Sequence, residues 1–191
     1  MIRWWRRLGE FFLDIIETLV IAMSLFLVVY LFAMQPHQVN GRSMVPNFQS
    51  GEYLLTDKVT YKFRNPQRGE VVVFHAPDEA NCPKGTGCDF IKRVLALPGE
   101  TVSVNQGKIL INGVPEPETY LPADFETETG NFIKDRIITL SPDEYFVVGD
   151  NRPASSDSRA WGPIHQSAMV GKAFFRYWPP STIGWLPHVS Y

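Results

Sequence analysis

Apolar residues are concentrated near the amino terminus of the chain. Phe11 to Met34 contains only two charged side chains, Asp14 and Glu17, both near its beginning. A helix of this length would measure about 36 Å, enough to cross a hydrocarbon core of about 30 Å. The pattern therefore predicts a transmembrane anchor over residues 11–34. A buried core helix and a cleavable signal peptide are the alternatives, but residues 34–38 lack the small residues that mark a cleavage site.

Positive charges are distributed unevenly around this segment. Arg3, Arg6 and Arg7 precede it, whereas the first basic residue after it is Arg42. Because positive residues are retained on the cytoplasmic side, residues 1–10 are predicted to be cytoplasmic and residues 35–191 extracytoplasmic. The aromatic residues at the two ends suit the membrane interfaces: Trp4, Trp5 and Tyr30.

The rest of the chain alternates short apolar runs with turn signals. The runs are rich in β-branched and aromatic residues and cover 53–59, 70–74, 90–97, 101–104, 108–111, 136–140, 145–148 and 170–177. Asn105-Gln-Gly107 is one of several turn signals between them, and Asn112-Gly113 predicts a tight hairpin turn. No long helical period follows the anchor. The fold class is therefore mainly β: a coiled antiparallel β-sheet domain with one N-terminal transmembrane helix.

Composition narrows the possible functions. The formal net charge is -2, with 18 basic and 20 acidic residues, so nucleic acid is not expected as a partner. The four His are scattered and no metal site is expected.

Cys82 and Cys88 bracket a Gly/Pro-containing loop, which outside the cytoplasm favours a small disulfide. Residues 113–131, rich in Pro and acidic side chains, predict an exposed and mobile loop.

Three stretches carry residues suited to catalysis. Ser43 lies in a turn between Gly41 and Pro46, where a hydroxyl can project; an ordinary turn serine is the alternative. Lys92 lies within an apolar strand, where loss of hydration lowers a lysine pKa, unless the side chain reaches solvent at an edge. The third stretch, 149–162, is dense in Asp, Asn, Ser and Arg and predicts a structured polar loop, with a solvated loop as the alternative. Its charged residues are expected to form pairs that fix it: Asp150, Arg152, Asp157 and Arg159.

Together these stretches resemble the type I signal peptidases, membrane-anchored proteases with a Ser-Lys dyad. The resemblance rests on four ordered motifs, at 43–46, 68–74, 92–100 and 149–159, and on the similar tail 176–185. It implies a serine endopeptidase of the cell membrane that cleaves signal peptides from exported preproteins. The implied partners are those signal peptides, the lipid bilayer and the secretion translocon, and no cofactor is implied.

The resemblance also implies residue roles. Ser43 would be the nucleophile and Lys92 the general base. Ser155 would hydrogen-bond and orient the Lys92 amine, with Asp157 and Arg159 forming a structural ion pair behind it. The oxyanion would be bound by the backbone at Ser43 and Gly41. Shallow substrate pockets would be lined by three neighbouring side chains: Met44, Phe90 and Ile91.

Two positions depart from the family pattern. Gly41 replaces a serine that some members use to bind the oxyanion, and Asn47 replaces a common threonine. The short segment 100–144 predicts a small β subdomain or insertion. Trp178, Trp185 and Phe174 are candidates for contact with the membrane or for core packing.

Two other functions remain as alternatives. A self-cleaving repressor-type Ser-Lys peptidase would share the chemistry, although the anchor and the absence of a DNA-binding helix-turn-helix argue against it. A membrane-anchored β domain that binds partners without catalysis is the second.

Overall fold

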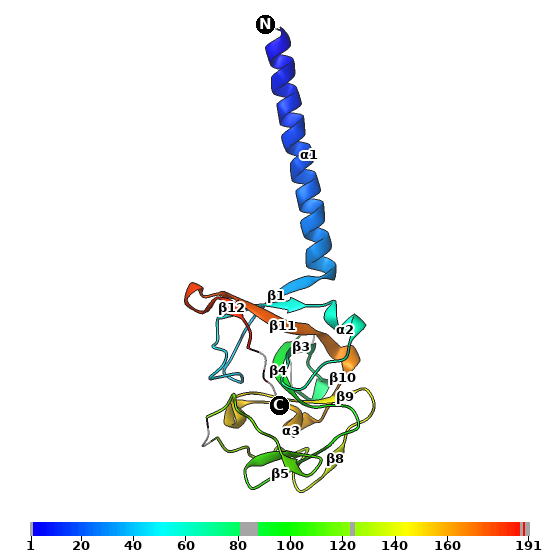
Figure 1. The fold of residues 1–191 in the computed structure, drawn as a ribbon, viewed down its shortest axis with the longest axis vertical. Helices are drawn as coiled ribbons and strands as arrows, with labels where there is room; N and C mark the ends of the chain where they lie inside the picture. The colour runs from blue at the N-terminus through cyan, green and yellow to red at the C-terminus, as the bar shows by residue number, and fades with distance from the viewer. Residues whose placement is uncertain (1, 81–87, 123–124, 188, 190–191) are drawn as a thin grey trace.

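The computed structural model describes residues 2–80, 88–122, 125–187 and 189. One long helix, α1 (Ile2–Phe32), projects from a β-rich domain (Figure 1). Residues 7–32 are long and apolar enough to cross a membrane, and an 18-residue window within them has a mean hydropathy of 2.5 and is not buried within the protein. The helix ends two residues before the predicted boundary, because Met34 already belongs to the first strand.

The larger of two sheets has eight strands, and every pairing in it is antiparallel. The spatial order is β1-β2-β11-β3-β4-β9-β10, with β12 added beside β11. The strands are β1 (Met34–Gln38), β2 (Tyr53–Asp57), β3 (Val71–His75), β4 (Asp89–Ala96), β9 (Glu144–Val148), β10 (Ile164–His165), β11 (Met169–Trp178) and β12 (Gly184–Trp185).

The smaller sheet has the order β7-β6-β5-β8 and is also antiparallel. Its strands fall within the segment 100–144: β5 (Thr101–Asn105), β6 (Lys108–Ile111), β7 (Val114–Pro115) and β8 (Ile138–Thr139). The hairpin predicted at Asn112 and Gly113 is present, and the turn predicted at residues 105–107 also forms a hairpin; φ is positive at both of these pairs: Gln106 and Gly107, and Asn112 and Gly113. These are the backbone conformations that two-residue hairpins require. The prediction of a mainly antiparallel β fold is confirmed.

Short helical turns complete the chain. They are α2 (Thr60–Phe63), α3 (Ser158–Trp161) and 3₁₀ turns at residues 78–80, 152–154, 166–168 and 180–182. The apolar runs at 53–59 and 136–140 form strands only over 53–57 and 138–139, whereas β1, β7, β10 and β12 had no clear signal. Pro36 is tolerated in β1 because this strand lies at the sheet edge.

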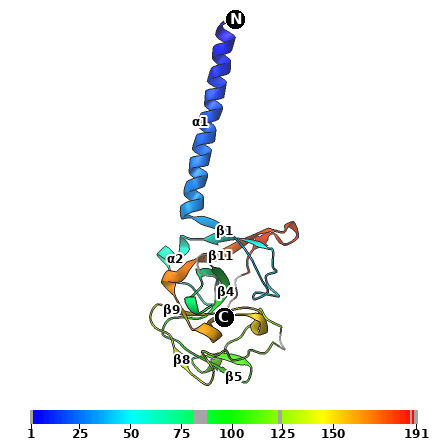
Figure 2. The same cartoon turned by 180° about the vertical axis from the view of Figure 1, so that it is seen from behind.

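The junction between α1 and the domain is held by several contacts. β1 follows the helix almost directly and pairs with β2 along its whole length. The Lys58 amide donates to the Ala33 carbonyl at 2.9 Å, and Lys58 Nζ donates to the Leu31 carbonyl at 3.1 Å. The end of α1 is therefore fastened to the sheet rather than joined to it by a flexible linker (Figures 1 and 2).

Candidate active site

Ser43 lies in the loop that connects β1 to β2. Two fully buried side chains on its carboxyl side, Met44 and Phe48, anchor this loop in a hydrophobic cluster. Gly41 has a φ of +93°, a conformation that glycine adopts readily and other residues rarely do. The loop therefore turns sharply before the serine, while the residues after it are fixed by packing.

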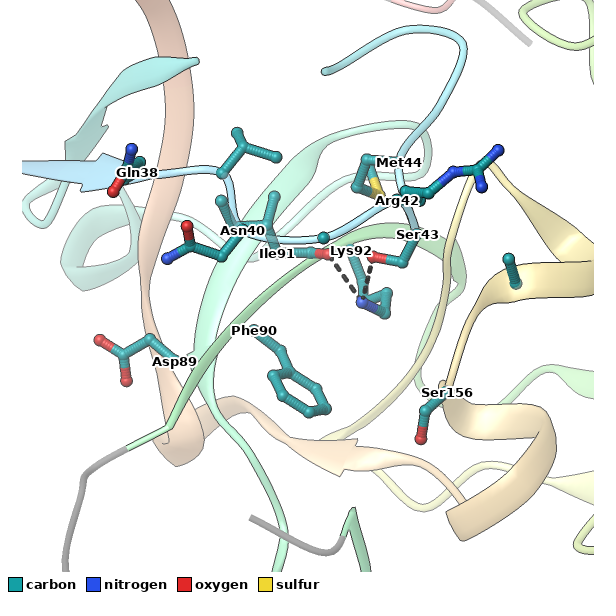
Figure 3. Close-up of a pocket in the computed structure, with 13 residues that line it drawn as sticks. Gln38, Asn40, Arg42, Ser43, Met44, Asp89, Phe90, Ile91, Lys92 and Ser156 are labelled. Atoms are coloured by element: carbon teal, nitrogen blue, oxygen red, sulfur yellow. Dashed lines mark hydrogen bonds between the residues drawn. The ribbon is translucent and has the colours of Figure 1, made fainter. Parts of the chain in front are cut away.

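Lys92 lies in the middle of β4 and is only 4% exposed. Its Nζ lies 2.9 Å from Ser43 Oγ, within hydrogen-bond reach, and donates to the Ile91 carbonyl at 3.0 Å. The Phe90 ring centroid lies 5.0 Å from the same nitrogen. Figure 3 shows the amine between the serine hydroxyl and this carbonyl. The structure thus brings together the two residues that the sequence placed 49 positions apart.

The surroundings of Lys92 favour its neutral form. Burial removes the ammonium from water and lowers the pKa of Lys92 from 10.5 to about 8. The carboxylates of Asp157 and Asp150 partly oppose this effect, while the Arg159 guanidinium reinforces it. Near neutral pH an appreciable fraction of the amine is therefore able to accept a proton.

The polar loop 149–162 packs directly behind the serine. A Cβ on Gly149 would lie 2.2 Å from Ser155 Oγ and 2.5 Å from the Ser43 carbonyl oxygen, so only glycine fits there. Asn151 binds the loop that carries Ser43 twice. Its amide donates to the Ser43 carbonyl at 2.9 Å, and its side chain donates to the Arg42 carbonyl at 3.0 Å.

The predicted ion pair between Asp157 and Arg159 is present. Arg159 donates from Nε and from a terminal nitrogen to the two carboxylate oxygens of Asp157, both at 2.8 Å. Asp157 also accepts from the Gly149 amide at 3.0 Å and caps the short helix α3. Both side chains are buried, so the pair fixes the loop from within.

The hydrogen bond predicted from Ser155 to the Lys92 amine is absent, and that prediction is wrong for this structure. Ser155 Oγ is buried and has no hydrogen-bond partner within the part of the chain that the structure describes. The Lys92 amine instead binds Ser43 and the carbonyl of Ile91.

The predicted oxyanion donors also differ from one another. The Gly41 amide donates to Ser50 Oγ at 3.2 Å, so it is already engaged and does not support that assignment. The Ser43 amide makes no hydrogen bond with any described residue. It remains available to bind a developing oxyanion.

Two ion pairs beside the site differ from the pairing expected within the loop. Arg93 makes a two-point contact with Asp150, at 2.8 and 2.6 Å, and Arg152 pairs with Glu118. Asn47 donates to Asp150 at 2.9 Å, which gives this departure from the family pattern a structural role. An arginine within an apolar strand is the sequence signal that could have indicated a buried carboxylate partner for Arg93.

Part of segment 113–131 is less exposed than its composition predicted. Arg152 is buried and binds Glu118, Thr127 and the Tyr120 hydroxyl. The Tyr120 carbonyl accepts from Asn47 at 3.1 Å, and its ring lies 4.2 Å from the Arg93 guanidinium carbon. Acidic and aromatic residues of this segment therefore buttress the site, a role that composition cannot reveal.

A cavity of about 280 Å³ opens beside the Ser43 hydroxyl. The three predicted substrate-binding residues line it: Met44, Phe90 and Ile91. Its other lining residues are Gln38, Val39, Asn40, Gly41, Arg42, Ser43, Asp89, Lys92, Ala154 and Ser156. A peptide entering this cavity would meet the serine hydroxyl.

The remaining candidates lie outside the cavity. Trp178 and Trp185 are 52% and 75% exposed, so neither is a core residue, and Phe174 packs against Trp185 with ring centroids 5.7 Å apart. Among the described residues no group of three or more His, Cys, Asp or Glu side chains is arranged to hold a metal ion. The predicted disulfide includes Cys82, which lies outside the described residues.

Comparison with known proteins gives matches over most of the chain. The family described as "Signal peptidase, peptidase S26" matches residues 12–178. A Synechocystis protein named "Probable signal peptidase I-1" is 38% identical over 179 residues, covering 93% of this chain and 88% of that protein. "Signal peptidase I" of Leptolyngbya laminosa is 35% identical over 181 residues, covering 92% and 85%. The crystal structure of a signal peptidase I from Enterococcus faecalis V583 is 31% identical, with a TM-score of 0.45 over 57% of this chain and 97% of that chain.

Proposed function

The chain belongs to the signal peptidase family, peptidase S26, and we propose that it cleaves signal peptides from exported preproteins with Ser43 as nucleophile and Lys92 as general base. The observation that carries this proposal is the 2.9 Å contact between Lys92 Nζ and Ser43 Oγ. The amine is buried and its pKa is lowered to about 8, which is what a lysine needs to act as a base.

The reaction would proceed through an acyl-enzyme. Neutral Lys92 takes the Ser43 proton as the oxygen attacks the scissile carbonyl, and the Ser43 amide donates to the resulting oxyanion. When the carbon–nitrogen bond breaks, the lysine returns its proton to the leaving amine of the mature protein. The neutral lysine then removes a proton from the water that attacks the ester carbonyl, and it returns this proton to Ser43 Oγ as the ester bond breaks and the signal peptide is released.

The rest of the polar network would hold this pair in place. Asn151 binds the carbonyl of Ser43, and the Asp157–Arg159 pair fixes the loop that carries Asn151. Rigid positioning matters because the reacting atoms must stay within about 3–3.5 Å of one another.

The membrane arrangement supports the choice of substrate. In our proposal α1 is a single membrane span with the arginine-rich end in the cytoplasm, so the β domain works at the outer surface beside the translocon. The exposed Trp178 and Trp185 lie in the β11–β12 region, at the end of the domain nearest to α1, where they would contact the interface (Figures 1 and 2). Enzyme and preprotein would then meet within the bilayer plane, which raises their effective concentration.

The test is cleavage of a preprotein by the full chain in detergent, with the new amino terminus identified by sequencing. We expect Ser43→Ala to abolish cleavage. Ser141→Ala, which changes an exposed serine in the segment 100–144, should leave cleavage unchanged. Cleavage by Ser43→Ala at the wild-type rate would refute the assignment.

The same assay separates the two alternatives. A self-cleaving peptidase would cut its own chain at a rate independent of enzyme concentration and leave the preprotein intact. A binding domain would cut neither. Turnover of many preprotein molecules per enzyme molecule is expected only of the proposed peptidase.

A further inference from the structure

The two ends of the active-site cavity carry opposite charges. Asp89, the first residue of β4, lines one end together with Gln38 and Asn40. Arg42, directly before the nucleophile, lies on the other side of the Ser43–Lys92 pair (Figure 3). An extended peptide bound across Ser43 would therefore have a carboxylate beside one part and a guanidinium beside the other.

The position of α1 indicates which end receives the signal peptide. Asp89 also lines a second cavity, which includes Leu31 and Phe32 at the carboxyl end of α1. The Asp89 end of the active-site cavity thus faces the place where the chain leaves the proposed membrane span. A signal peptide whose apolar segment lies in the bilayer would arrive from this side. The first residues of the mature protein would leave past Arg42.

The two charges differ in how far they are satisfied. The Asp89 carboxylate lies 2.7 Å from His75 Nδ1 and 3.5 Å from His37 Nε2. The His37 imidazole is partly buried, and this burial lowers its pKa. Three arginines near the site, Arg93, Arg152 and Arg159, have carboxylate partners, but no described carboxylate forms an ion pair with the exposed Arg42. Its guanidinium is available to a substrate.

We propose that Arg42 is a specificity-determining residue that favours preproteins with an acidic residue at the first or second position of the mature chain. This inference rests on the proposed function, because it assumes that a signal peptide crosses Ser43. The guanidinium would form an ion pair with the substrate carboxylate, and Asp89 would disfavour a carboxylate on the signal-peptide side. The exposure of Arg42 limits the size of the effect.

The experiment measures relative kcat/KM by competition between forms of one preprotein that carry Glu, Gln or Lys at the first mature position. With the full wild-type chain in detergent at low salt, we expect the Glu form to be preferred over Gln by about two- to fivefold, with Lys least favoured. The preference should shrink in about 1 M salt, which screens exposed charges. Arg42→Gln should remove the preference and Arg42→Glu should reverse it.

Arg136→Glu is the matched control, because it makes the same change in net charge at an exposed position of the other subdomain. It should keep the wild-type preference. A form with Glu two residues before the scissile bond, where Asp89 would repel it, should be cut more slowly than its Gln counterpart.

The outcomes distinguish this inference from the proposed function. Equal cleavage of the Glu, Gln and Lys forms by the wild-type chain at low salt would overturn the inference and leave the peptidase assignment intact. Failure of the wild-type chain to cut any form would overturn the proposed function itself. Because the wild-type measurement needs no substitution, poor folding of an Arg42 variant would not prevent a decision.

Discussion

Two neighbouring residues of β4 show how similar burial can lead to opposite chemistry. Lys92 and Arg93 are 4% and 3% exposed, and both are bases that are normally charged. Arg93 has a two-point contact with Asp150 and a further hydrogen bond to the Gly69 carbonyl at 2.9 Å. Lys92 has only a hydroxyl and a carbonyl as hydrogen-bond partners among the described residues. Burial without a directly paired carboxylate disfavours the charge of a lysine, whereas burial with one preserves the charge of an arginine.

A permanent cation at position 92 should remove the chemical difference between Lys92 and Arg93 most completely. Lys92→Arg keeps the positive charge but cannot supply a neutral base, because a guanidinium does not deprotonate in proteins. Loss of general-base catalysis is expected to lower kcat by about a thousandfold or more. Rates of preprotein cleavage measure this, with Lys108→Arg, an exposed lysine in β6, as the matched control. Turnover near that of the wild type would show that Lys92 is not the base.

Removing the partner of Asp150 tests the other half of the contrast. Arg93→Met should leave a buried carboxylate without its cation and destabilise the fold by about 3–5 kcal/mol. The unfolding midpoint of the full chain in detergent is the measurement. The double variant Arg93→Met/Asp150→Asn should recover part of the loss. If the single variant unfolds like the wild type, the ion pair does not stabilise the domain.

Removing the Lys92 amine should have the opposite effect and stabilise the fold at neutral pH. The lowering of the Lys92 pKa from 10.5 to about 8 corresponds to about 3 kcal/mol of lost stability when the amine is charged in both states. Because the unfolded chain binds more protons than the folded one between pH 8 and 10.5, wild-type stability rises with pH over that interval.

Lys92→Met should therefore raise the unfolding midpoint at pH 7, while abolishing cleavage. Its advantage over the wild type should be full below pH 8 and should disappear above pH 10.5. A variant less stable than the wild type at pH 7 would contradict this account of the buried amine.

The smallest expected effect is that of pH on the unmodified protein. Since only neutral Lys92 can accept the Ser43 proton, kcat/KM for a preprotein should rise about tenfold per pH unit below pH 8 and level off above it. Initial rates at low substrate concentration, between pH 6 and 9.5, measure this profile. A rate independent of pH over this range would not fit a lysine base.

The sequence predicted local features better than long-range pairings. The Asn105–Lys108 and Asn112–Gly113 turns depend on residues a few positions apart, and the apolar neighbours of Lys92 within its own strand already indicated that its amine could be desolvated. The partner of Asp150 is Arg93, 57 residues away, and that of Arg152 is Glu118, 34 residues away. Composition limits which charges exist, but tertiary packing decides which of them meet.

The two hydrogen bonds that differed from prediction have the same cause. Ser155 was expected to bind Lys92, and the Gly41 amide was expected to face the oxyanion. In the structure the lysine binds the carbonyl of Ile91 and the Gly41 amide binds Ser50. Nearby acceptors compete for the same donors, a backbone carbonyl for Lys92 and a side-chain hydroxyl for the Gly41 amide, and a motif does not record which acceptor is nearest.

In the proposed membrane orientation, the fastened junction between α1 and β1 would set the height of Ser43 above the bilayer. Lys58 donates hydrogen bonds to the end of α1. β1 follows the helix, pairs with β2 along its whole length and leads into the loop that carries Ser43. In the proposed membrane orientation, a domain on a loose tether would sample many elevations above the bilayer, whereas the fastened junction would hold the Ser43 hydroxyl near one elevation. Each residue of an extended peptide spans about 3.3 Å, so a substrate whose cleavage point lies several residues too near or too far from its own apolar helix would miss it. The anchor would thus select substrates by the number of residues between their apolar helix and their cleavage point, in addition to attaching the enzyme to the membrane.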